Sequence, residues 1–184
     1  MMTGKRTGVI FAGVLFPILL FGLSPQGFAM KPGNIPPAVL SQEINRHLAT
    51  LNYYDVFDHL TFRIVAPGTV DLAGQVTRAG LKADAEAAIR RIKGVDNVVD
   101  QVEVLPQSAV DDAIRWAAFR AIFDKPALQK YATQSTDPLR IIVKNREITL
   151  DGEVASQFDK GLIDMSARSV TEATGVTDHL IVGH

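Results

Sequence analysis

Residues 69–76 read TVDLAGQV, and a closely similar segment, ITLDGEV, occupies residues 148–154. The glycines at the centre of these segments, Gly74 and Gly152, are 78 residues apart. The same offset relates residues outside the two segments, namely Lys82 and Lys160, Arg90 and Arg168, and Val102 and Leu180. A fixed offset that persists over several predicted elements indicates duplication of one supersecondary unit.

A glycine–valine pair follows the next predicted helix of each copy, and it does not keep this offset. Gly94-Val95 in the first copy matches Gly175-Val176, which lies 81 residues further along. We therefore expect about three additional residues in the second copy, within its helix or the helix cap.

The hydrophobic pattern predicts the elements of each copy. In the first, residues 41–51 and 81–92 have helical periodicity, and residues 60–65, 70–76 and 98–105 are predicted strands. The corresponding helices of the second copy are residues 109–123 and 158–171, and its strands are residues 140–144, 146–153 and 176–182. A hairpin followed by a strand–helix–strand crossover gives a mixed sheet. We expect an α+β fold of two tandem α-β-β-α-β units, residues 38–106 and 107–184, each a small three-stranded sheet covered by two helices.

The first 29 residues have the pattern of a cleaved signal peptide. Lys5 and Arg6 precede an apolar run at residues 9–23, and Gly27 and Ala29 place small residues before Met30. The alternative is an uncleaved anchor helix, for which this run is short, since a span needs about 20 residues. Residues 30–37 are predicted to be an extended leader.

Composition excludes several classes of site. The chain has no cysteine, so disulfides, thiolate metal sites and lipoprotein acylation are excluded. Removal of Lys5 and Arg6 with the signal peptide lowers the formal net charge from −1 to −3. An acidic chain of this kind is not expected to bind nucleic acid, which requires a basic face.

The spacing of glycines and valines in both copies resembles the BON domain. The first copy carries the pattern at Val70, Leu72, Gly74, Val76, Gly94, Val95, Val98, Val102 and Val104, and the second at Ile148, Leu150, Gly152, Val154, Gly175, Val176, Leu180 and Val182. A signal peptide with two such domains is similar to the periplasmic dual-BON proteins of Gram-negative bacteria. The resemblance implies a non-enzymatic envelope protein with phospholipid binding and a role in osmotic or envelope stress.

No catalytic or metal-binding constellation is visible. The histidines, His47, His59, His179 and His184, show no metal-ligand spacing, and no phosphate-binding glycine loop occurs. We expect no enzyme activity, no metal and no cofactor.

The helix at residues 109–123 carries two apolar stripes. Val110, Ile114, Ala117 and Ala121 fall on one side, and Trp116, Phe119 and Phe123 fall on the other, flanked by Arg115 and Arg120. The aromatic stripe predicts either contact with anionic phospholipid, through insertion of the rings beside two arginines, or burial against the first unit.

Two functions therefore remain open. The first is a periplasmic protein that binds an anionic phospholipid surface and supports envelope integrity. The second is a periplasmic chaperone or interaction module for envelope proteins, using the same apolar surface. Four glycines, Gly74, Gly94, Gly152 and Gly175, are expected to be structural.

Overall fold

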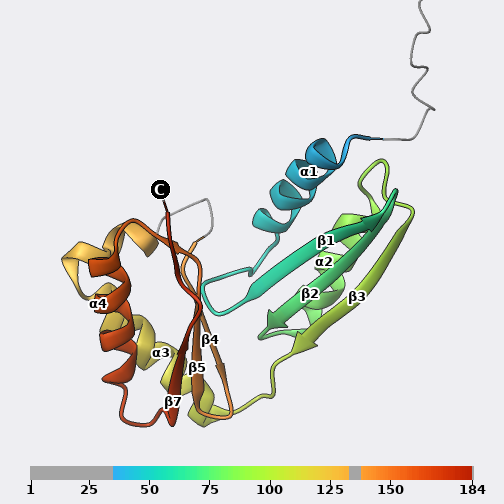
Figure 1. Cartoon of the computed structure of the whole chain (residues 1–184). Helices are drawn as coiled ribbons and strands as arrows, with labels where there is room; N and C mark the ends of the chain where they lie inside the picture. Colours follow the sequence, from blue (N-terminus) through green and yellow to red (C-terminus); the bar gives the residue numbers. More distant parts are fainter. Residues whose placement is uncertain (1–34, 133–137, 184) are drawn as a thin grey trace, which may run out of the picture. The chain divides into compact units, whose positions relative to one another are not determined.

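The first domain has the predicted order of helices and strands (Figure 1). The structure, a computed structural model, describes residues 35–132 and 138–183, so the predicted signal peptide lies outside the described residues. The elements are α1 (Pro37–Ala49), β1 (His59–Ala66), β2 (Thr69–Val76), α2 (Ala79–Arg90) and β3 (Asn97–Val104). Strand β2 lies between an antiparallel β1 and a parallel β3, as a hairpin and a crossover require.

The core of the first domain lies between its helices and one face of its sheet. Leu40, Ile44 and Leu48 recur every fourth residue along α1 and are buried, so they form its inward stripe. Leu81, Ala85 and Ile89 do the same on α2, and they meet Val70 and Leu72 of β2 in one cluster.

The second domain repeats this arrangement with one added helix. It contains α3 (Ala109–Phe123), the 3-10 helix η1 (Pro126–Ala132), β4 (Arg140–Lys144), β5 (Glu147–Asp151), β6 (Glu153–Val154), α4 (Gln157–Arg168), β7 (Gly175–Asp178) and β8 (Ile181–Val182). Its sheet order is β4-β5-β7, and β6 and β8 continue β5 and β7 as a parallel pair. The helices α3 and α4 cover one face of this sheet (Figure 1). The predicted α+β class with two repeated units is confirmed.

The two copies keep one offset from β2 to β3 and from β5 to β7, which corrects the predicted insertion. Thr69 pairs with Asn97, and Glu147, which is 78 residues beyond Thr69, pairs with Gly175. Helices α2 and α4 have equal length, 12 residues each. Gly175 therefore corresponds to Asn97 rather than to Gly94. The second glycine–valine pair is a coincidental match, because the structure places it at the start of β7.

Gly74 and Gly152 are required by a close approach of two strands. Both have positive φ, +119° and +130°. A Cβ at Gly74 would lie 2.0 Å from the His59 carbonyl oxygen, and one at Gly152 would lie 2.8 Å from that of Pro138. In both domains the close neighbour is backbone at or just before the start of the adjacent strand, β1 or β4.

The other two predicted glycines differ from each other. Gly94 has φ of +92°, and a Cβ there would meet the Ile35 side chain at 2.8 Å. At Gly175 the nearest atom to an added Cβ is Glu147 Cγ at 3.9 Å, an ordinary contact. The structure thus gives a steric reason for Gly94, and it gives none for Gly175.

Candidate functional site

Helix α3 begins at a well-formed cap that also holds the β4–β5 turn. The Ser108 hydroxyl accepts a hydrogen bond from the backbone N–H of Asp111. The buried Asp111 carboxylate in turn accepts the backbone N–H groups of Asn145 and Arg146, both of which have positive φ. These bonds fix the position of α3 relative to the sheet.

The inward stripe of α3 is rotated from the predicted one. Ile114, Ala118 and Ile122 are fully buried, whereas Val110, which the helical pattern places on the same side as Ile114, is 49% exposed. This rotation brings Arg115 and Phe123 into the domain and leaves Trp116 and Arg120 outside.

Arg115 is a structural residue, which corrects its predicted place on an exposed surface. It is only 4% exposed, and its guanidinium donates to the Val143 carbonyl oxygen at 2.6 Å and to the Asp112 carboxylate. Val143 lies in β4, at the edge of the second sheet. The arginine therefore caps a backbone carbonyl at that edge and cannot contact a membrane.

The predicted aromatic stripe forms a cluster that includes a residue of the first domain. Phe57 makes edge-to-face contacts with Trp116, at 5.1 Å between ring centroids, and with Phe119, at 6.1 Å. Phe119 also packs on Phe123 at 4.8 Å. Phe57 and Phe123 are buried and belong to the core of the second domain. The alternative of burial against the first unit is thus realised for the inner part of the stripe.

One side of the Trp116 ring packs against other aromatic rings, and the other side is exposed to solvent. It contacts Phe57 and Phe119, yet 53% of its surface is exposed. Arg120, one helical turn further on, is exposed and makes no ion pair within the described residues. An exposed indole beside an uncommitted guanidinium can contact a surface that is both apolar and anionic.

Phe57 reaches the second domain as part of a connecting segment, residues 54–58, which we call the strap. The backbone N–H of Ile141 in β4 donates to the Val56 carbonyl oxygen at 2.8 Å. The Arg140 guanidinium donates to the Asp55 carbonyl oxygen at 2.5 Å and lies over the Tyr54 ring at 4.2 Å. The only sequence signal of this role is the apolar pair Val56-Phe57 ahead of the predicted strand at residues 60–65.

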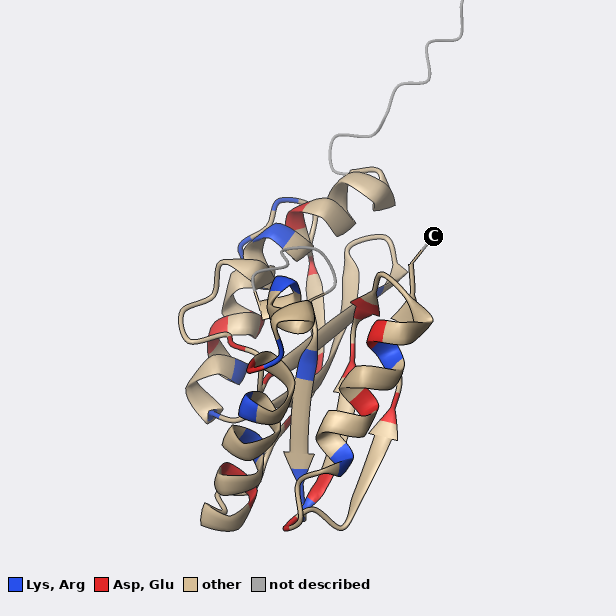
Figure 2. Ribbon diagram, turned by 90° about the vertical axis from the view of Figure 1, so that its left-hand side faces the viewer, with Lys and Arg blue, Asp and Glu red and all other residues tan. Residues whose placement is uncertain are grey.

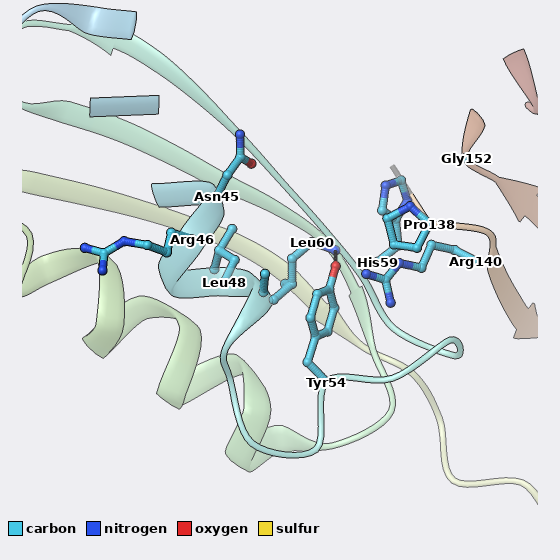
Figure 3. Close-up of a pocket in the computed structure, with 10 residues that line it drawn as sticks. Asn45, Arg46, Leu48, Tyr54, His59, Leu60, Pro138, Arg140 and Gly152 are labelled. Atoms are coloured by element: carbon cyan, nitrogen blue, oxygen red, sulfur yellow. Dashed lines mark hydrogen bonds between the residues drawn. The ribbon is translucent and has the colours of Figure 1, made fainter. Parts of the chain in front are cut away.

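A cleft of about 430 Å³ opens beside the strap (Figure 3). Arg140 and Tyr54 point toward one another at one side of it, whereas the Arg46 side chain extends away from them. Arg46 is paired with Glu43, and Arg140 is held by the strap, so both cations already have partners.

Asp151 links histidines from both domains. Its carboxylate lies 3.5 Å from His59 Nδ1 at the start of β1 and 3.3 Å from His179 Nδ1. The hydrogen bond from His59 is the main cause that holds the pKa of Asp151 below its ordinary value, while burial acts in the opposite direction.

Three further features bear on the class of function. Within residues 35–132 and 138–183, no three His, Cys, Asp or Glu side chains are placed to hold a metal ion. No helix in the same ranges is long and apolar enough to cross a bilayer. Figure 2 shows acidic and basic residues intermixed along the helices and strands.

Comparison with known proteins identifies both repeats. A family model described as BON domain matches residues 40–106 and 125–184, so the predicted resemblance is confirmed. A search of curated proteins gives no match.

Solved structures give only remote similarity. One is of CdsD, a structural protein of the type III secretion system of Chlamydia trachomatis, with 12% identity, 79% of this chain and 92% of that chain covered, and a TM-score of 0.29. The C-terminal domain of CdsD, from the same organism, has 11% identity, with 82% and 100% covered and a TM-score of 0.29.

Proposed function

Since the chain belongs to the BON-domain family and carries two copies of the domain, we propose that it is a non-enzymatic periplasmic protein that binds anionic phospholipid. Binding at the membrane surface would support envelope integrity or the response to osmotic stress. Export by the predicted signal peptide, residues 1–29, would place the protein in the periplasm.

The observation that carries this proposal is the half-exposed Trp116 on the outer face of α3. Phe57 and Phe119 hold the ring from behind, so it loses little conformational freedom when it enters the headgroup region. Tryptophan is enriched at that depth because its ring is apolar and its N–H is polar.

Arg120 supplies the electrostatic part of the proposed contact. Each arginine near an anionic surface contributes about 1 kcal/mol. Because Arg120 is exposed and has no ion-pair partner within the described residues, it loses no such pair on binding. Arg115 takes no part, because it is buried beneath β4.

Tryptophan fluorescence tests the proposal directly, because Trp116 is the only tryptophan in the chain. Vesicles rich in phosphatidylglycerol should shift its emission to shorter wavelength, and vesicles of phosphatidylcholine should not. The shift should weaken with salt, since charges are screened over about 8 Å at physiological ionic strength.

Sedimentation with vesicles tests the two residues separately. Trp116→Ala and Arg120→Gln should each weaken sedimentation while keeping the melting temperature near that of the wild type. Arg46→Gln is the matched control: Arg46 follows Ile44 in α1 as Arg120 follows Ala118 in α3. Unchanged emission with both vesicle types would refute the lipid proposal.

The second candidate, a chaperone or interaction module for envelope proteins, uses the same exposed apolar residues. It would lead if the wild type ignored vesicles but suppressed aggregation of an unfolded envelope protein, and if Trp116→Ala abolished that suppression.

A further inference from the structure

Helix α4 carries an apolar stripe whose two ends are exposed and lie outside the core of the second domain. Phe158 and Met165 are 73% and 61% exposed. Gly161 and Leu162 lie between them on the same side of the helix, at the i+3 and i+4 positions from Phe158, and Leu162 is half-buried against the core of the second domain. We call Phe158, Gly161, Leu162 and Met165 the α4 stripe. It runs over two turns without a charged residue.

The first domain provides an internal control for this stripe. Helices α2 and α4 have equal length and are related by the repeat offset of 78 residues, from Ala79–Arg90 to Gln157–Arg168. The positions equivalent to the stripe are Gly80, Ala83, Asp84 and Ala87. The same helix in the same fold is therefore built with small and acidic residues there, so the fold does not require Phe158 or Met165.

Gly161 gives a second indication. It is in the interior of a helix, where glycine costs about 1 kcal/mol relative to alanine. A Cβ at this position would meet nothing within 4 Å. No contact within the described part of the chain explains a residue without a side chain at this position.

The first α-helix of the second domain shows the same contrast with its counterpart. The buried triads Leu40, Ile44 and Leu48 of α1 and Ile114, Ala118 and Ile122 of α3 have identical spacing, so they set the correspondence between the two helices. On this correspondence Trp116 replaces Gln42. Both helices of the second domain thus carry exposed apolar residues at places where the first domain has polar or small ones.

We infer that the α4 stripe is a second point of insertion into the same anionic phospholipid surface, so that the membrane contact spans α3 and α4. The inference rests on the proposed function. Helices α3 and α4 cover the same face of the sheet, so their outer sides belong to one layer (Figure 1). Isolated apolar side chains that protrude from an uncharged helix face suit insertion at the headgroup boundary.

The charges around the stripe also favour lipid as the occupant. Asp164 is paired with Arg168, and Asp159 with Lys130, so neither acid of α4 opposes an anionic surface alone. Arg120 on the adjoining helix is exposed and has no ion-pair partner among the described residues.

A site-specific probe tests the inference in the full-length mature protein. The chain has no cysteine, so Met165→Cys can be labelled at one position with an environment-sensitive fluorophore. Phosphatidylglycerol vesicles should shift the emission of this label to shorter wavelength. The matched control is Ala87→Cys, at the equivalent position of α2, where the emission should not change.

Truncation provides an independent readout. The double variant Phe158→Ala/Met165→Ala should bind phosphatidylglycerol vesicles about tenfold or more weakly, because two inserted side chains are lost. Val39→Ala/Ile181→Ala, which removes two exposed apolar side chains elsewhere, should bind as the wild type does.

The outcomes separate this inference from the proposed function. If Trp116→Ala loses vesicle binding and the double variant retains it, the inference is overturned and the proposed function stands. Self-association of the wild type that the double variant abolishes would assign the stripe to a second copy of the chain, which also overturns the inference. If the wild type itself ignores the vesicles, both are rejected.

Discussion

Lys82 and Lys160 occupy equivalent places in the two domains, and each binds the outer strand of its own sheet. Lys82 Nζ donates to the Val102 carbonyl oxygen at 2.6 Å, and Lys160 donates in the same way to Leu180. In each domain an aspartate two residues earlier, Asp100 or Asp178, accepts the backbone N–H of the same strand residue at 2.8 Å. The duplicated pair of interactions occupies backbone groups at a sheet edge that could otherwise recruit another strand.

Lys82→Met should open this edge in the first domain. Loss of one hydrogen bond is expected to cost about 0.5–1.5 kcal/mol. The larger effect should be association through β3, detected as increased light scattering on storage at high concentration. Lys93→Met, at an exposed lysine of the same domain, is the control and should do neither. Equal scattering by both variants would contradict a protective role for Lys82.

Gly74→Ala and Gly152→Ala should both destabilise the protein, by on the order of 1–3 kcal/mol. The loss should be greater at Gly74, where the added Cβ would lie 2.0 Å from a carbonyl oxygen rather than 2.8 Å. Urea denaturation measures both. Gly161→Ala, in open space within α4, should instead gain up to about 1 kcal/mol. The steric account is refuted if the three variants have equal stability.

Phe57→Ala should loosen the association of the two domains. Phe57 is buried in the second core, and removal of such a ring typically costs about 3–5 kcal/mol. Because Phe57 contacts Trp116, the variant should also shift tryptophan emission to longer wavelength in the native state. Val65→Ala, at an exposed position of the first domain, should leave the emission unchanged. A variant that melts with wild-type stability would show that Phe57 contributes little to the association of the domains.

Asp151 should make stability depend on pH in the acid range. Its pKa in the folded protein is lowered, chiefly by the hydrogen bond from His59. A lowered pKa means that the carboxylate stabilises the fold above its unfolded-state pKa of about 4, and that this contribution disappears as the pH falls through the folded-state pKa. Asp151→Asn should be less stable at pH 6 and should lose less stability between pH 5 and pH 2.

Urea denaturation across this pH range measures the effect. Asp84→Asn, at an exposed residue of α2, is the control and should follow the wild-type curve. Parallel curves for Asp151→Asn and the wild type would mean that the contact with His59 does not stabilise the fold.

Export makes a prediction about the mature N-terminus. Small residues at Gly27 and Ala29 predict cleavage before Met30, give or take a few residues. Intact-mass spectrometry of protein from the envelope fraction should find that terminus, and a chain that still begins at Met1 would contradict cleavage.

The order and topology of the elements could be predicted because they depend on local patterns. Hydrophobic periods identified the helices and strands, and the offset between Gly74 and Gly152 identified the duplication. The pair Gly175-Val176 was misleading because it has the same two residue types as Gly94-Val95 but occupies a different place in the fold. Val98 and Val176, at the offset of 78, were the correct equivalent pair, and the strand register shows this.

The candidate surface could be predicted only in part. Helical periodicity separated Trp116 from Ile114 correctly, but it could not show which intermediate side chain would turn inward. Arg115 turns inward because its guanidinium binds the carbonyl oxygen of Val143 in β4, which is 28 residues further along the sequence. The strap was missed for a similar reason, because the partners of Phe57 lie on a helix of the other domain and follow no sequence period.

Phe57 also determines where the chain can be divided. It is encoded in the first repeat, yet its ring completes the core of the second. A fragment that starts at residue 107 would contain a cavity in place of this ring, and a fragment that ends at residue 106 would expose the ring to water. The boundaries of the sequence repeat therefore differ from those of the segment that forms a complete core. Recombination that replaced either domain alone would have to supply a matching side chain at position 57.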